Sequence, residues 1–178
     1  MQSNTAALPR RAVESLRGQF ASTLKMLKTF VEVCPQDVWE SCYFGFSYPV
    51  WYQAFHAAFF IDFWFRDAYD GSEYRSMVFD GRIPPEFEYE VDPSLMVSRV
   101  DILTFLDKLQ AKTQCFFDHL HDGTLGESIV QEAENYTYAD VIAGQIRHVM
   151  YNVGYLNGIL RSLDLEESDW YSYNEKEP

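Results

Sequence analysis

A run of apolar residues from Tyr48 to Phe65 limits the folds open to this chain more than any other feature. Four residues that would be costly in a lipid-facing helix interrupt the run, namely Pro49, Gln53, His56 and Asp62. We therefore expect a buried helix over about 48–70 and no membrane span. Because the run is apolar almost all round, other helices must cover it on most sides.

Three further segments show helical periodicity and predict helices over about 8–34, 98–122 and 138–163. The clearest apolar seam alternates spacings of four and three residues and consists of Ile142, Ile146, Val149, Val153, Leu156, Leu160 and Leu163. Pro35 ends the first helix, and capping-box patterns begin the last two at Ser98 and Thr137. The residues thus predict one all-α domain over 1–178, with a glycine-ended third helix at Gly123 and an acidic tail over 164–178 that Trp170 anchors.

The charge balance excludes one class of partner. The 178 residues carry 14 basic and 27 acidic side chains, a net charge of -13, and no basic cluster beyond Arg10 and Arg11, so we expect no nucleic-acid partner. The N-terminus lacks an apolar signal segment, which predicts a cytoplasmic protein. Three cysteines without C-x-x-C spacing predict reduced, mostly buried thiols.

Histidine is scarce, and two of the four copies lie in the middle of apolar helices. His56 and His148 are either core histidines with hydrogen-bond partners or metal ligands. His119 and His121 lie near a helix C-terminus, where a histidine interacts favourably with the helix dipole. Asn152 follows His148 by four residues and shares its helical face. Helix bundles can build a metal site from two histidines on different helices and a third ligand one turn along one of those helices.

Two segments carry a resemblance to a known family. YQAFHAAFFID over 52–62 and IRHVMYNVGYLN over 146–157 resemble the DinB-like superfamily of four-helix-bundle metalloenzymes. The resemblance implies an up-down-down-up bundle with a long crossover between helices two and three, and a homodimer. It also implies a zinc or nickel ion held by His56 and His148, with Asn152 standing where the family has its third histidine.

The function implied by this resemblance is a divalent-metal-dependent S-transferase or isomerase that uses a low-molecular-weight thiol and acts on a small molecule. The alternative is a non-catalytic small-molecule-binding or dimeric scaffold protein with a degenerate metal site, because Asn152 replaces a ligand. Tyr151 and Tyr155 flank the predicted site as candidate substrate-binding residues, with packing as the alternative. No catalytic residue is assigned.

Two charged residues complete the expectations for the site. Asp62 lies about 240° round the helix from His56, so we expect a surface or interhelical ion pair and not a partner for that histidine. The acidic chain favours neutral or cationic substrates unless the cleft is locally basic, and Arg147 is the nearest positive charge.

Overall fold

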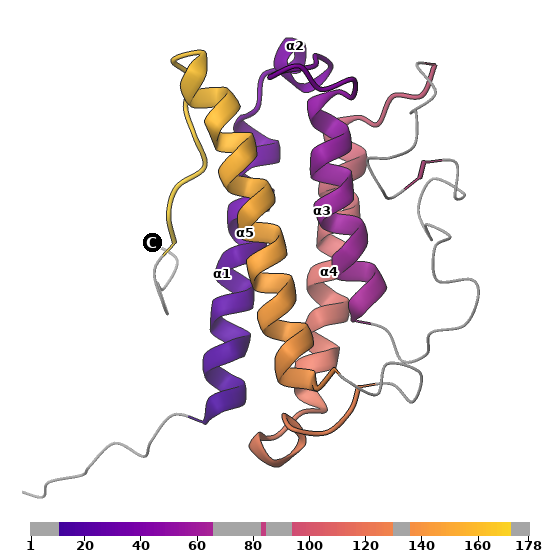
Figure 1. The fold of residues 1–178 in the computed structure, drawn as a ribbon, viewed down its shortest axis with the longest axis vertical. Coiled ribbons are helices and arrows are strands. Elements are labelled where there is room, and N and C mark those ends of the chain that lie inside the picture. The colour runs from indigo at the N-terminus through magenta and orange to yellow at the C-terminus, as the bar shows by residue number, and fades with distance from the viewer. Residues whose placement is uncertain (1–10, 66–82, 85–93, 130–135, 172–178) are drawn as a thin grey trace, which may run out of the picture.

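The computed structural model describes residues 11–65, 83–84, 94–129 and 136–171, and this part of the chain is mostly helical. Four long helices, α1 (Ala12–Val33), α3 (Val50–Trp64), α4 (Arg99–Asp118) and α5 (Tyr138–Ser162), lie side by side in Figure 1. Two short elements accompany them, α2 (Gln36–Trp39) and the 3-10 turn η2 (Asp122–Thr124). The predicted all-α class is confirmed.

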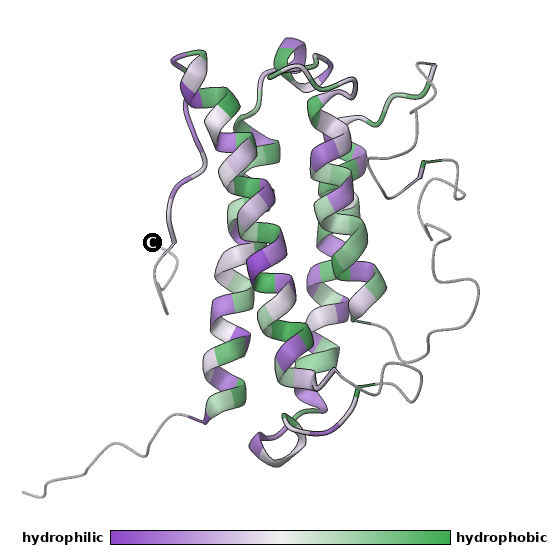
Figure 2. Ribbon diagram, in the orientation of Figure 1, coloured by the Kyte–Doolittle hydropathy of each residue, from purple (hydrophilic) through white to green (hydrophobic). Residues whose placement is uncertain are grey.

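The core lies between the four long helices. α1 packs against both α4 and α5, and α3 packs against the same two helices, while α2 contacts α3. Hydrophobic and hydrophilic residues alternate along α1 and α5 in Figure 2, as expected for helices with one buried face. The predicted seam of α5 is buried from Ile142 to Leu160 except for Ile146, which is half-buried. Its last member, Leu163, is 40% exposed and lies beyond the helix.

Helix α3 is buried as its sequence predicts. Twelve of its 15 residues are buried. Of the two kinds of ion pair expected for Asp62, surface or interhelical, the structure shows the interhelical one, with Lys112 of α4 at 2.6 Å. Among the helices that the structure describes, none combines the length and apolar character that crossing a bilayer requires. The predicted end near residue 70 is wrong, because the backbone of Phe65 (φ -98°, ψ 55°) already leaves the helix.

Both predicted capping boxes are present. The side chains of Ser98 and Thr137 accept hydrogen bonds from the backbone N–H groups of Asp101 and Asp140, whose carboxylates bond back. The glycine-ended α4 is wrong: α4 ends at Asp118, and Gly123 belongs to η2 without a positive φ. Asp122 has another role there, since it accepts hydrogen bonds from the first backbone N–H groups of α1, at 3.1 and 3.0 Å.

Most of the predicted crossover falls outside the described residues, but its described parts pack against the core. Ile83 and Val97 are buried, and the Tyr52 hydroxyl donates to the carbonyl of Pro84 at 2.6 Å. The indole N–H of Trp39 donates to the carbonyl of Val97 at 2.8 Å, which fixes the approach to α4 beside α2.

The end of the described chain is held differently from the prediction. Trp170 is 69% exposed and anchors nothing. Tyr171 anchors this end of the described chain to α1 instead. Its hydroxyl lies 2.9 Å from the Thr29 hydroxyl, and its ring lies under the Lys25 ammonium. Upstream, Asn157 of α5 binds the buried Ser168 through side-chain and backbone hydrogen bonds.

The thiols also differ from the prediction. Only Cys34 is buried, whereas Cys42 and Cys115 are exposed. All three are free, and burial raises the pKa of Cys34 to about 12. The prediction fails because cysteine is common in protein interiors, and that tendency does not fix the position of an individual thiol.

Candidate functional site

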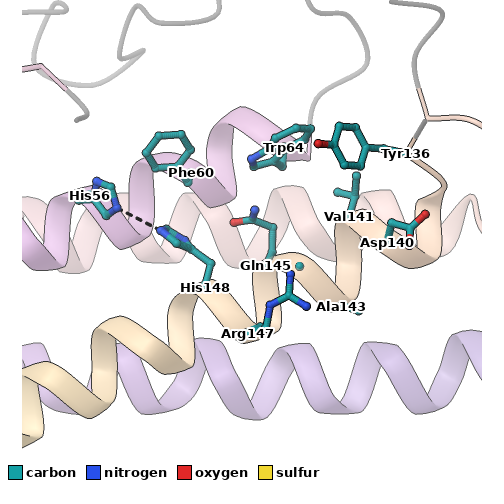
Figure 3. A pocket seen from close by; sticks show the side chains of 11 residues that line it. His56, Phe60, Trp64, Tyr136, Asp140, Val141, Ala143, Gln145, Arg147 and His148 are labelled. Atoms are coloured by element: carbon teal, nitrogen blue, oxygen red, sulfur yellow. Dashed lines mark hydrogen bonds between the residues drawn. The ribbon is translucent and has the colours of Figure 1, made fainter. Parts of the chain in front are cut away.

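The structure brings the two mid-helix histidines together. The Nε2 atoms of His56 on α3 and His148 on α5 lie 3.1 Å apart, and the two imidazoles point toward each other in Figure 3. Phe60 packs edge-on against both rings, with centroid distances of 4.9 Å to His56 and 5.4 Å to His148. The two histidines therefore come from two different helices and share one aromatic neighbour, Phe60.

The surroundings of His148 shift its protonation equilibrium. Burial, together with the neighbouring His56, lowers the pKa of His148 to about 4. Its imidazole is therefore neutral near pH 7, the form that a metal ligand or a general base requires. Within the described part of the chain its Nδ1 is buried and has no hydrogen-bond partner.

Asn152, the third predicted ligand, is 1% exposed and has its polar atoms engaged elsewhere. Its Oδ1 accepts a hydrogen bond from Nε2 of Gln53 at 2.5 Å, and its Nδ2 donates to the carbonyl of His148 at 2.8 Å. The amide thus links α5 to α3 one turn away from the histidine pair.

Gln53 is the site residue that the sequence reasoning missed. It lies one turn before His56 on α3 and is 3% exposed, and its Oε1 finds no partner among the described residues. A signal was present, because Gln53 is one of few polar residues in a helix that is apolar almost all round.

A cavity of 590 Å³ opens beside the histidine pair, between α3 and the first half of α5. It is lined by His56, Phe60, Trp64, Tyr136, Asp140, Val141, Ala143, Gly144, Gln145, Arg147 and His148. We call it the α3–α5 cavity. Its size and its mixture of aromatic walls with a few polar groups are typical of small-molecule sites.

Gln145 fixes one wall of this cavity. Its buried amide, oriented by its hydrogen bonds, donates to the carbonyl of Phe60 at 3.2 Å and accepts from the indole N–H of Trp64 at 3.3 Å. Trp64 in turn meets Tyr136 edge-on, with centroids 5.7 Å apart. The aromatic wall is therefore positioned by a hydrogen-bonded side chain that crosses from α5 to α3.

The two candidate tyrosines do not line the α3–α5 cavity. Tyr151 is 76% exposed, and Tyr155 packs edge-on against Phe44 and Phe46 at 5.7 and 5.5 Å. These rings form a separate aromatic cluster at the loop before α3. Burial, with Tyr155 and Tyr151 nearby, raises the pKa of Tyr48 in this cluster to about 12.

His119 and His121 lie near the end of α4, as predicted, and do not line the cavity. The Nδ1 atom of His119 lies 2.7 Å from the carbonyl of Cys115, in the last turn of α4. This contact is the kind that a histidine makes with the exposed carbonyls of a helix C-terminus.

The donor set fits a divalent ion through two imidazoles. Two nitrogens bound to one tetrahedral zinc at about 2.0–2.1 Å lie roughly 3.3 Å apart, and the two Nε2 atoms are 3.1 Å apart. In the described part of the chain no group of three or more His, Cys, Asp or Glu side chains surrounds a common point. Other coordination positions would therefore go to a molecule from the cavity or to water.

Comparison of the chain with protein-family models, with curated proteins and with solved structures gave no match. The resemblance to the DinB-like superfamily, with the metal, thiol and homodimer that it implies, thus stays a prediction.

Proposed function

We propose that this chain is a DinB-like metalloprotein that binds a small molecule in the α3–α5 cavity, beside a zinc or nickel ion held by His56 and His148. The observation that carries the proposal is the approach of the two Nε2 atoms to 3.1 Å at the edge of that cavity. Because His148 is neutral near pH 7, its ring carries no second proton that an ion would have to displace. The one proton that the two Nε2 atoms share in their hydrogen bond would move to an Nδ1 atom when an ion binds.

We further propose the up-down-down-up helix order that the resemblance implies. Three contacts support it. Arg99, at the start of α4, donates to the carbonyl of Cys34 at the end of α1; Trp39 bonds Val97 just before α4; and Asp122, after α4, caps the start of α1. α4 then runs opposite to α1, and the long segment between α3 and α4 returns the chain to the end where α3 begins.

The chemistry would follow from the open coordination positions. A bound divalent ion lowers the pKa of a thiol or water that it holds, which supplies a nucleophile at neutral pH. The chain's own residues hold the two imidazoles in place through Phe60 and the Asn152 amide. The aromatic wall of the cavity excludes water from one side of the site. A thiol-dependent S-transferase or isomerase is the reaction class we propose.

A non-catalytic binding protein with a degenerate metal site is the second candidate. Two observations favour it. The Asn152 oxygen is already bonded to Gln53, and among the described residues Nδ1 of His148 has no partner of the kind that metal-bound histidines nearly always have.

Zinc titration of the purified chain tests the proposal. We expect about one ion per chain, strong loss of affinity in His56→Gln and His148→Gln, and no change in the matched control His119→Gln. Circular dichroism of each variant checks folding. Absence of uptake in the wild type, with uptake gained in Asn152→His, would support the second candidate. Turnover of a low-molecular-weight thiol with an electrophile, lost in His148→Gln, would support the enzyme.

A further inference from the structure

The α3–α5 cavity has one wall of rings. Phe60 and Trp64 follow His56 along α3 at intervals of four residues, and Tyr136 meets Trp64 edge-on, so these side chains succeed one another in Figure 3. The other side is formed by α5, where Ala143 and Gly144 project little or nothing into the space between the larger Val141, Gln145 and Arg147. A cavity with rings along one side accepts an aromatic molecule.

The polar groups in the cavity are not evenly distributed. Arg147 precedes His148 directly, and in the described part of the chain no carboxylate lies within salt-bridge distance of its guanidinium. Of the eight other cations in this part, four form ion pairs, namely Arg17, Lys28, Lys112 and Arg161. Arg147 is therefore an exposed positive charge at the cavity that is available to a ligand.

The acidic group in the cavity, Asp140, lies at the end away from the histidine pair. Asp140 begins α5, about 12 Å along the helix axis from His148 at 1.5 Å per residue. One of its carboxylate oxygens, Oδ2, is engaged by the backbone N–H and hydroxyl of Thr137 in the capping box. The capping hydrogen bonds lower the pKa of Asp140 and keep it charged. A cationic group would thus share a carboxylate whose Oδ2 the helix cap already holds, whereas an anionic group meets the guanidinium of Arg147, which forms no ion pair with a described carboxylate.

We infer that the α3–α5 cavity binds a flat aromatic molecule carrying one negatively charged group, with its ring against Phe60 and Trp64 and its anion on Arg147. This inference names the ligand class for the small-molecule site proposed above and rests on that proposed use of the cavity. It reverses the preference for neutral or cationic ligands that the net charge of -13 alone predicts, because the local charge beside the rings decides recognition.

The test uses three probes with the same ring system: 2-naphthoate, 2-naphthamide and 2-naphthylmethylammonium. Each is titrated by calorimetry into the full-length chain, with and without EDTA. We expect 2-naphthoate to bind roughly tenfold more tightly than the other two, as one charge-assisted hydrogen-bonded pair allows. Arg147→Gln should remove that preference. Its control on the same helix, Arg161→Gln, removes an exposed arginine paired with Glu167 and should change nothing.

A second variant fills the α3–α5 cavity. A Cβ added at Gly144 meets no heavy atom within 4 Å, so Gly144→Leu should enter open space, abolish binding of all three probes and leave the melting temperature unchanged or higher. The inference is overturned if the amide or the cation binds as tightly as 2-naphthoate. It is also overturned if Arg147→Gln keeps the preference, which would mean that a metal ion alone recruits the carboxylate.

Zinc titration of the same samples separates the two proposals. Zinc uptake without binding of any probe would overturn the ligand class and leave the metal site standing. The expected probe binding without zinc uptake would leave the ligand class standing and refute the metal site.

Discussion

The buried amide pair between α3 and α5 makes a sharp energetic prediction. Gln53 and Asn152 share one hydrogen bond of 2.5 Å, and both side chains are almost fully buried, at 3% and 1% exposure. We consider Asn152→Leu, Gln53→Met and the double variant. Each change replaces an amide by an apolar side chain of similar length, so the main loss is polar and not steric.

The magnitudes follow from which polar atoms stay buried without a partner. Asn152→Leu leaves the Gln53 Nε2 donor unsatisfied beside an Oε1 that already lacks a partner in the described structure, and should lower the free energy of unfolding by about 2 kcal/mol. Gln53→Met leaves the Asn152 oxygen without a hydrogen-bond partner, which destabilises the protein, but it also removes the unsatisfied Oε1, which stabilises it. The two contributions to the free energy of unfolding should therefore offset each other to within about 1 kcal/mol. In the Gln53→Met protein, Asn152→Leu removes the Asn152 oxygen that had lost its partner, so the free energy of unfolding should hardly change.

Urea unfolding of the four proteins measures the coupling, which we expect to be about 2 kcal/mol in favour of the double variant. Asn157→Leu is the matched control, since Asn157 lies on the same helix but bonds Ser168, and it should add to Gln53→Met without coupling. Additivity of the Gln53 and Asn152 changes within about 0.5 kcal/mol would refute the reasoning.

Two further predictions concern the buried histidine and the thiols. Because the pKa of His148 is lowered from 6.5 to about 4, the unfolded chain binds a proton in this window that the folded chain does not. The free energy of unfolding should therefore fall by about 1.5 kcal/mol when the pH is lowered from 6.5 to 5. Urea unfolding at several pH values measures this fall, and an equal fall in wild type and His148→Gln would contradict the prediction. In the native protein, Cys42 and Cys115 should react with a disulfide reagent at once, and Cys34 only after urea; three fast thiols would refute the burial of Cys34.

Local patterns in the sequence predict the helices because helix formation is largely a local matter. The capping boxes at Ser98 and Thr137 place the starts of α4 and α5 to within a residue. The end of α3 was not predictable in the same way, since Phe65 continues the apolar pattern while its backbone has already left the helix. The four residues of α2 are too few to show a period.

The site was predictable only in part, for a related reason. A helical face determines which residues of one helix lie together, so His148 and Asn152 were placed on one stripe correctly. Which atoms then meet across two helices depends on their register. That register brings His148 to His56 and turns the Asn152 oxygen to Gln53, a contact that no spacing within either segment encodes.

This register also explains how the chain could hold an ion with one histidine fewer. The Asn152 amide donates to the carbonyl of His148 and accepts from α3, so it fixes the turn of α5 that carries the imidazole. A positioned pair of imidazoles loses less conformational entropy on binding than a mobile pair, which offsets part of a missing ligand. If Asn152 has that role, Asn152→Leu should weaken zinc binding even though its oxygen is bonded to Gln53, and the Gln53→Met protein should share the defect.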